Sequence, residues 1–257
     1  MLNQFSRTQL LLGEEGMERL FSARVAVFGI GGVGGYTVEA LARSGVGALD
    51  LIDDDRVCLT NINRQLLALH TTVGQYKVDV AAERVHAINP NCTVTTHKCF
   101  YLPETKDQFD FTQYDYVVDA IDTLGPKVAL IEETLRRGAP LVSSMGAALR
   151  VDADLVRFGK LTGVSNCPLA AQLRKRLRRV GVNTDDVDCV YSPEPIRDAL
   201  RAGDERIERV AEPEPLRSPD ERSPQWRPRN TLGSLSTIVG IFGLRLAHEV
   251  VLRLARR

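Results

Sequence analysis

The sequence Arg24-Val-Ala-Val-Phe-Gly-Ile-Gly-Gly-Val-Gly34 decides how the first half of this chain folds. Residues 24–28 are apolar and rich in β-branched side chains, which predicts a buried strand. Apolar residues recur at helical spacing from 33 to 43, so a helix is expected directly after the glycines. Glycines at such a junction allow a tight turn and let backbone N–H groups approach a phosphate at the helix N-terminus. The stretch therefore predicts a strand–turn–helix unit of the nucleotide-binding type.

Strand-like and helix-like segments keep alternating up to about residue 150. Further strands are expected at 48–52, 116–120 and 141–144, and an amphipathic helix at 75–88, which Asn89-Pro90 ends. Such alternation is typical of a parallel sheet that is covered by helices on both faces. We therefore expect an α/β fold with a doubly wound, mostly parallel, Rossmann-like sheet and a smaller C-terminal extension.

The chain after residue 150 is less regular. Residues 168–180 predict a strongly basic helix that begins at Pro168. Residues 193–229 hold seven of the 12 prolines among dense opposite charges, so we expect an exposed, partly disordered excursion there. Residues 231–244 carry no charge, but this run is shorter than the roughly 20 residues that span a bilayer. A buried C-terminal helix is expected instead of a membrane span.

The composition suits a globular chain with a sizeable core. Hydrophobic residues make up 44% of the 257 residues, and Lys+Arg and Asp+Glu are both 33. This balance argues against a protein coated in basic charge and leaves room for a local basic patch. No two of the five cysteines form a CxxC pair, and their odd number in a long chain is typical of reduced thiols. The N-terminus lacks the pattern of a signal peptide, so we expect a cytoplasmic protein with no membrane association.

An acidic cluster, Asp53-Asp54-Asp55, follows the second predicted strand. An acid at this position can accept hydrogen bonds from ribose hydroxyls. Together with the glycines of the turn, Gly29, Gly31, Gly32 and Gly34, it forms a dinucleotide-binding fingerprint. Glycines that only allow close helix–strand packing are the alternative, and the position of the acid disfavours it. The fingerprint predicts nucleotide binding but does not separate NAD from ATP.

The segments after the acidic cluster favour ATP. Residues 60–65 read Thr-Asn-Ile-Asn-Arg-Gln, and residues 73–77 read Val-Gly-Gln-Tyr-Lys. A carboxylate that attacks the α-phosphate of ATP needs cations, because both reactants are anions, whereas a nicotinamide site has no use for them. Arg64 can hold phosphate bidentately, and Lys77 supplies a compact charge. Asp122 follows the next strand and is placed to hold Mg²⁺.

These spaced motifs resemble the adenylation domain of the ubiquitin-activating-enzyme-like superfamily, which includes the ThiF/MoeB/HesA proteins. The resemblance covers about residues 5–150. It implies that Asp53 binds the ribose of ATP, that Arg64 and Lys77 bind the triphosphate, and that Asp122 serves Mg²⁺ and the reacting phosphate. It also implies nucleotide contacts for Asp55, Asn61 and Gln65. Arg7 resembles an arginine that reaches the partner's ATP in a homodimer, although an exposed N-terminal arginine is an equal alternative.

Over nearly its whole length the chain resembles one family of that superfamily, the tRNA threonylcarbamoyladenosine dehydratases. The matching pieces include Ile88-Asn-Pro-Asn-Cys92, Ser144-Met-Gly-Ala-Ala148 and Asp188-Cys-Val-Tyr-Ser192. The family has Asp before Pro-Leu-Ala, where this chain has Cys167. The resemblance implies a single ThiF-like adenylating domain over 1–257, with a nucleotide-binding half at 1–150 and a substrate-side extension at 151–257.

The same resemblance implies the reaction and its partners. The threonyl carboxylate of N6-threonylcarbamoyladenosine in tRNA is adenylated with ATP and Mg²⁺ and then closes on the substrate's own nitrogen, so no enzyme cysteine is needed. A monovalent cation, and a cysteine desulfurase with its sulfur acceptor, are further candidates for a ligand and a partner. Five cations in residues 174–179 suit tRNA phosphates, with a solvated helix face balanced by the acidic excursion as the alternative.

Two other functions stay open at this point. An adenylyltransferase that activates a ubiquitin-like sulfur carrier would want a working cysteine, for which Cys167 and Cys189 are the candidates. Cys189 lies in a strand-like run and reads better as a small buried residue. A non-enzymatic dinucleotide-binding module is disfavoured by Arg64, Lys77 and Asp122 together.

Overall fold

The computed structural model describes residues 3–196 and 232–256. Within these residues a seven-stranded sheet forms in the order β3-β2-β1-β4-β5-β7-β6. The strands are β1 (Arg24–Phe28), β2 (Ala48–Ile52), β3 (Thr93–His97), β4 (Tyr116–Asp119), β5 (Leu141–Ser144), β6 (Arg157–Lys160) and β7 (Asp188–Tyr191). All neighbouring strands pair in parallel except β6, which runs antiparallel to β7 at the edge. The expected α/β fold with a doubly wound, mostly parallel sheet is confirmed.

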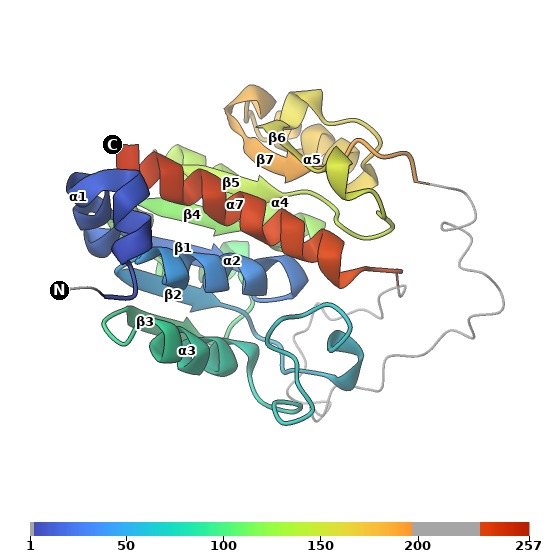
Figure 1. The fold of residues 1–257 in the computed structure, drawn as a ribbon. Helices are drawn as coiled ribbons and strands as arrows, with labels where there is room; N and C mark the ends of the chain where they lie inside the picture. The colour runs from blue at the N-terminus through green and yellow to red at the C-terminus, as the bar shows by residue number, and fades with distance from the viewer. Residues whose placement is uncertain (1–2, 197–231, 257) are drawn as a thin grey trace.

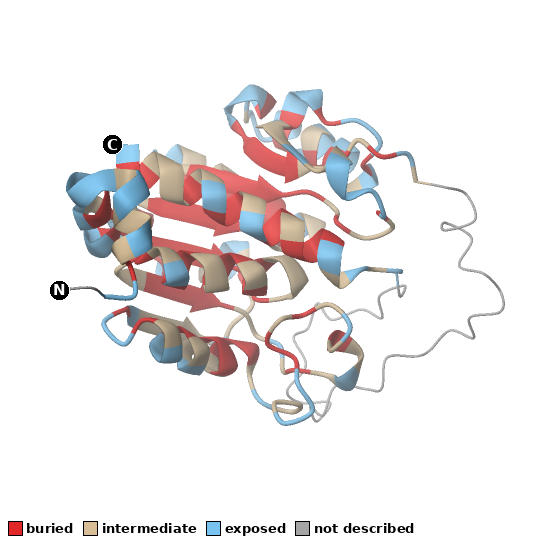
Figure 2. Ribbon diagram, viewed as in Figure 1, coloured by how far each residue is buried: buried red, intermediate tan, exposed pale blue. Residues whose placement is uncertain are grey.

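Helices cover both faces of this sheet (Figure 1). They are α1 (Ser6–Ser22), α2 (Gly32–Ser44), α3 (Lys77–Ile88), α4 (Leu124–Arg136), α5 (Pro168–Arg179) and α7 (Ser236–Arg256). The alternation of side chains along β1 shows why: Val25 and Val27 belong to one buried cluster, and Ala26 and Phe28 belong to another. The first cluster is shared with α2, α3 and α7, and the second with α4 and α5. The central strands are therefore buried on both sides (Figure 2).

Helix α7 is the buried C-terminal helix that the uncharged run predicts. Its buried face includes Ile238, Phe242, Leu246 and Val250, which are all fully buried. Gly243 lets it approach α2 closely, since a Cβ there would lie 2.4 Å from the carbonyl oxygen of Val33. Among the helices of residues 3–196 and 232–256, none is both long and apolar enough to cross a bilayer. The expected excursion at 193–229 lies outside the described residues from position 197 onward.

The strand order reverses direction between β1 and β4. The chain passes from β1 outward to β2 and β3, and then returns to place β4 on the other side of β1. In open α/β sheets, ligands bind at such a switch point, beyond the carboxyl ends of the strands. The glycine turn follows β1 at this point, and the loop from 120 to 123 follows β4 beside it. The topology therefore directs attention to this edge.

Candidate active site

The glycine turn connects β1 to α2 at the switch point. Gly29 has a φ of +90°, and a Cβ there would lie 2.8 Å from the carbonyl oxygen of Ala120. A Cβ on Gly34 would lie only 1.8 Å from the carbonyl oxygen of Gly29, so the start of α2 fits against the turn only without a side chain. Gly31 precedes the helix and offers no side-chain cap, so the first N–H groups of α2 have no side-chain acceptor there. These N–H groups and the helix dipole form a site for an anion such as a phosphate.

Asp53 fixes this turn from the end of β2. One carboxylate oxygen accepts the N–H of Ile30 at 2.7 Å, and the other accepts the N–H of Asp55 at 2.8 Å. The Asp53 side chain is only 10% exposed. Both of its oxygens retain further lone pairs, so the carboxylate can still accept hydrogen bonds from a ligand hydroxyl. The structure thus brings the predicted ribose-binding acid next to the predicted phosphate turn.

Lys77 brings a buried positive charge to the same place. Its Nζ lies 2.8 Å from a carboxylate oxygen of Asp55 and 4.0 Å from one of Asp53, and its side chain is 7% exposed. Burial alone would lower the pKa of Lys77, but the carboxylates of Asp53 and Asp55 raise it overall, with a smaller contribution from Asp122. Burial raises the pKa of Asp53, and Lys77 works in the opposite direction. The Lys77 ammonium therefore stays charged at the start of α3, within the field of all three acids.

The loop between β2 and α3 carries the remaining predicted residues. Asn61 is buried and accepts the N–H of Cys58 at 3.1 Å, which shapes the loop. Gln65 is also buried, and its Nε2 lies 4.0 Å from where a Cβ of Gly31 would be. Arg64 is partly exposed and uses one guanidinium nitrogen to bind the carbonyl of Thr60 at 2.8 Å. The predicted motif is thus folded against the glycine turn.

Asp122 stands on a loop that a buried network holds in place. Asp119, at the end of β4, and Lys127, in the first turn of α4, are both fully buried, with 2.7 Å between their charged atoms. Lys127 also donates to the carbonyl of Ile121 at 2.9 Å, and Ser143 donates to Asp119 at 2.6 Å. Asp122 itself is exposed and accepts a hydrogen bond from the Thr123 hydroxyl at 3.2 Å. The network fixes the backbone on which this carboxylate is presented.

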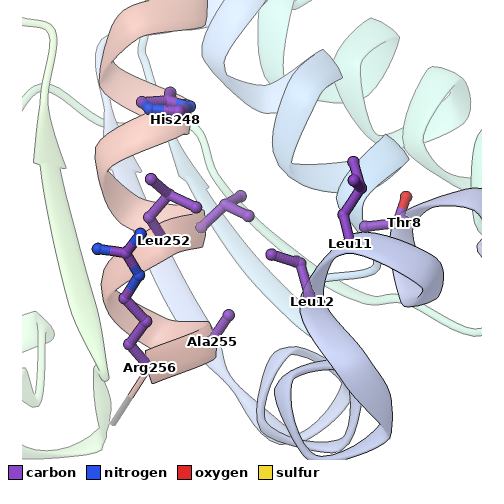
Figure 3. A pocket seen from close by; sticks show the side chains of 8 residues that line it. Thr8, Leu11, Leu12, His248, Leu252, Ala255 and Arg256 are labelled. Carbon is purple, nitrogen blue, oxygen red and sulfur yellow. The ribbon is translucent and has the colours of Figure 1, made fainter.

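Arg7 is the one predicted site residue that the fold places far from the others. Helix α7 starts beside the N-terminal end of α2, where Ser236 hydrogen-bonds Tyr36 at 2.8 Å. Its other end, at Ala255 and Arg256, borders the same hollow as Thr8 of α1 (Figure 3). A helix of 21 residues is about 30 Å long. Arg7, next to Thr8, is therefore on the order of 30 Å from the glycine turn of its own chain.

The two candidate thiols, Cys167 and Cys189, are both buried. Cys189 is fully buried, as predicted, and burial raises the pKa of its thiol to about 12. Cys167 is 6% exposed, and its Sγ accepts the N–H of Ala170 at 3.4 Å, so it caps the N-terminus of α5. The tRNA threonylcarbamoyladenosine dehydratases have Asp at this position. Cys167 can accept the same kind of capping hydrogen bond that an Asp side chain would accept.

Two charged residues at this edge escaped prediction from the sequence. Lys127 lies in the run Pro126-Lys-Val-Ala-Leu130, and a lysine on the apolar side of a helix is a signal that could have been used. Arg150 is 2% exposed and donates to the backbone carbonyls of Glu194 and Asn166, thereby joining three segments. Arg150 acts through contacts that are distant in the sequence, whereas Lys127 pairs with Asp119 across the loop that joins β4 to α4.

The fold and site define a doubly wound α/β protein with a phosphate-binding type of turn and a buried cation beside it. The model of the ThiF family matches residues 5–257, and the chain belongs to this family. The predicted superfamily is thereby confirmed.

Three relatives show where the chain falls within that family. A tRNA threonylcarbamoyladenosine dehydratase of Bacillus subtilis is 47% identical over 194 residues, which are 76% of this chain and 76% of that protein. The crystal structure of Escherichia coli tRNA N6-threonylcarbamoyladenosine dehydratase, TcdA, in complex with ATP superposes with a TM-score of 0.82. The two sequences are 35% identical, and the superposed region covers 98% of this chain and 93% of the TcdA chain. An adenylyltransferase and sulfurtransferase uba4 of Aspergillus terreus is 37% identical over 56% of this chain and 29% of that protein.

Proposed function

We propose that this protein is an ATP-dependent tRNA threonylcarbamoyladenosine dehydratase that adenylates the threonyl carboxylate and then closes the side chain into a ring. The observation that carries the proposal is Lys77, a buried cation beside a glycine turn and an acid suited to ribose. Relatives of this name are similar over three quarters of the chain, whereas the sulfurtransferase relative is similar over 56%. The alternative that a sulfur carrier is the substrate is correspondingly less well supported.

The residues divide the binding of ATP among them. The N–H groups at the start of α2 bind phosphate oxygens, because a helix N-terminus favours anions. Asp53 accepts the ribose hydroxyls. Lys77 and Arg64 approach the triphosphate from α3 and the preceding loop, and neutralise charge that would repel an incoming carboxylate. The Gln65 amide lies beside Gly31, which places a further hydrogen-bond donor within reach of a phosphate bound at this turn.

The chemistry then takes two steps. A carboxylate oxygen of the threonyl group attacks the α-phosphorus, the bond to the β-phosphate breaks, and pyrophosphate leaves. The carbamoyl nitrogen next attacks the activated carbonyl carbon, loses its proton and expels AMP, so the substrate has lost one water overall. The ring closure is intramolecular and needs no thioester. Both cysteines considered above are buried, which agrees with this course.

A magnesium ion fits the donors at this edge. Mg²⁺ is bound in ATP enzymes by one or two carboxylates together with phosphate oxygens. Asp122 offers an exposed carboxylate that is electrostatically coupled to Lys77. Asp122 would hold the ion, which would reduce the negative charge of the phosphates when bound. A monovalent cation and a sulfur-transfer partner stay predictions.

In a homodimer Arg7 could contact the nucleotide of the second protomer, although it is too far from the nucleotide site of its own chain. The distance of on the order of 30 Å from its own glycine turn means that it could act only on the nucleotide of a second protomer. Leu10 and Leu11 beside it are 86% and 87% exposed, and the neighbouring hollow of about 470 Å³ between α1 and α7 has a largely apolar lining. A second copy that covers this face would remove the apolar surface from water. We propose a cytoplasmic homodimer of single-domain chains.

The proposal can be tested with two substrates side by side. The protein is incubated with Mg·ATP and either tRNA that carries threonylcarbamoyladenosine or a ubiquitin-like sulfur carrier. Release of pyrophosphate and AMP with the tRNA alone, and loss of one water from the modified nucleoside by mass spectrometry, is the expected result. Pyrophosphate release with the carrier and not with the tRNA would overturn the proposal. The Lys77→Ala variant, which lacks the ammonium, serves as the inactive control.

A further inference from the structure

Helix α5 has one buried face and one strongly cationic face. Its sequence, Pro-Leu-Ala-Ala-Gln-Leu-Arg-Lys-Arg-Leu-Arg-Arg, contains no acid. Ala170, Leu173 and Leu177 are fully buried, at the spacing that places them along one side of a helix. The exposed cations, which we call the α5 cationic face, are Lys175, Arg176, Arg178 and Arg179. The apolar stripe explains how the helix is held, but it does not explain the cations.

Arg174 does not belong to this face. Its guanidinium donates to the carbonyl oxygens of Leu161 and Val164, at 3.1 and 2.7 Å, and the side chain is partly buried. It therefore fastens α5 to the preceding 3₁₀ turn, Leu161–Gly163. The expectation that all five cations of residues 174–179 are available to phosphates is wrong in this respect, and four remain.

Several other arginines at helix ends and on helix surfaces of the described chain are neutralised by neighbouring acids. Arg136 and Arg137, at the end of α4, both bind Glu133, at 2.5 and 2.9 Å. Arg43 and Arg84 share Glu39 in the same way. Among residues 3–196 and 232–256, by contrast, no acid forms an ion pair with the α5 cationic face. Asp185 and Asp186 in the following 3₁₀ turn are exposed and reduce the net positive charge of this region. They are two acids against four cations, so the region stays positive.

The position of α5 relates this face to the candidate site. Cys167, at its N-terminus, lies 3.7 Å from where a Cβ of Gly146 would be, just beyond the carboxyl end of β5. Two strand spacings, about 10 Å, separate β5 from β1 and its glycine turn. The cations from Lys175 to Arg179 follow at about 10 to 17 Å along the helix axis. Arg174 contacts Leu161, which pairs with Val187 just before β7, so α5 runs back from the carboxyl edge of the sheet toward its amino edge. A large substrate that presents one group to the glycine turn would have to extend back along α5 to reach these cations.

We infer that the α5 cationic face binds the phosphate backbone of the tRNA whose modified nucleotide occupies the candidate site. This inference rests on the proposed function, since it presumes an RNA substrate. Arginine is suited to phosphate by its planar, bidentate donors, and three of the four cations are arginine. Four cations on one helix, with no acidic partner among the residues that the structure describes, match a polyanion, and no aromatic side chain on this helix is available to stack on bases. Phosphate contacts of this kind position a nucleic acid without reading its sequence.

The chain offers a matched control for the test. Arg178-Arg179 and Arg136-Arg137 are both adjacent arginine pairs at the end of a helix, but only the second pair is neutralised by an acid. The variant R178Q/R179Q should bind tRNA about tenfold or more weakly at moderate salt. The slope of log affinity against log salt should fall by about 1.5, since each lost phosphate contact removes about 0.7 to 0.9. The variant R136Q/R137Q should keep the wild-type affinity and slope.

Two further measurements make the outcome decisive. The variant R178K/R179K keeps the charge and should retain most of the slope, and ATP affinity should be unchanged in all three variants because α5 lies outside the nucleotide turn. Equal losses in R178Q/R179Q and R136Q/R137Q, or an unchanged slope in R178Q/R179Q, would overturn the inference while leaving the proposed function standing. A wild-type protein that neither binds nor dehydrates the modified tRNA would instead refute the proposed function itself.

Discussion

Two glycines of the same turn should respond to alanine in different ways. Gly34 lies where α2 meets the turn, and its added Cβ would be 1.8 Å from the carbonyl oxygen of Gly29 and 2.9 Å from the carbonyl carbon. Gly31 lies three residues earlier, and its Cβ would meet only the Gln65 Nε2, at 4.0 Å. The first position is closed by backbone, and the second is open toward the place proposed for phosphate. We therefore expect Gly34→Ala to harm folding and Gly31→Ala to harm nucleotide binding.

The size of the first effect follows from what must move. Overpacking a core with one extra methyl group typically costs about 1 to 3 kcal/mol when side chains can shift. Here the obstacle is the backbone of the turn, which is held by the Gly29 N–H to the carbonyl of Ile52 at 2.8 Å. We expect Gly34→Ala to lower the free energy of unfolding by at least about 3 kcal/mol. In a chain of this size that is a fall in Tm of about 10 °C.

The second effect is on affinity. A methyl group at Gly31 stands between the N–H groups of α2 and a phosphate, and the second glycine of such a turn is the one that allows this approach. Gly31→Ala should weaken ATP binding by tenfold or more, which is about 1.4 kcal/mol, and should change the Tm without nucleotide by no more than about 2 °C.

Thermal unfolding by circular dichroism, with and without Mg·ATP, separates the two effects. ATP should raise the Tm of wild type strongly and that of Gly31→Ala weakly. Gly35→Ala is a suitable control, because its Cβ would make ordinary contacts of 3.7 and 3.8 Å with Leu67 and this glycine is not part of the fingerprint. The reasoning would be refuted by a Gly34→Ala variant as stable as wild type, or by a Gly31→Ala variant that binds ATP normally.

Three shorter predictions concern buried polar groups. Lys77→Ala should reduce pyrophosphate release on the order of a hundredfold, since it removes a phosphate-stabilising cation. It should also destabilise the fold, because Asp53 loses its counter-charge. Normal pyrophosphate release would contradict the role of Lys77. Lys127→Met should lower the free energy of unfolding by about 3 to 5 kcal/mol in urea denaturation, because it leaves Asp119 buried and unpaired; a loss below 1 kcal/mol would contradict the network. Burial favours the neutral thiol and so raises the pKa of Cys189 to about 12. The thiol should therefore resist alkylation at pH 8 in the native protein but not in denaturant. The variant Cys189→Ser should retain dehydratase activity, because no thioester is needed.

Prediction from the sequence succeeded where the signal was local. Residues 24–28, 48–52 and 141–144 were expected as strands and coincide with β1, β2 and β5. The helix expected at 75–88 begins at Lys77 instead, because Gln75 and Tyr76 still belong to the loop and the Lys77 N–H binds the carbonyl of Asp55. Runs of apolar residues and glycines determine such elements through neighbours in the chain, so they can be read without the fold.

The polar networks could not be predicted because their contacts form only once the strands and helices have packed together. A buried lysine at position 127 is tolerated only because Asp119, at the end of the preceding strand β4, is buried opposite to it. Arg150 meets Glu194, 44 residues away. Arg174 looked like one of five equivalent cations, and only its contact with the carbonyls of Leu161 and Val164 distinguishes it from the rest. Charge in a sequence shows that a partner is needed but not which one.

The charges around the glycine turn explain why one site needs both acids and cations. Without nucleotide, Asp55 and Asp53 neutralise Lys77, which keeps a buried ammonium from destabilising the fold. In the proposed complex the triphosphate of ATP would compete for the same ammonium, and the carboxylate of Asp122 would oppose the attraction of Lys77 and of the helix N-terminus. On the function proposed above, a divalent ion held by Asp122 would offset the repulsion from its carboxylate, and Asp55, whose side chain is 53% exposed, would turn to solvent when Lys77 turns to the phosphates. If the proposed function holds, the same acids that stabilise Lys77 here would make its transfer to the nucleotide depend on the metal, and ATP without Mg²⁺ should bind more weakly than Mg·ATP.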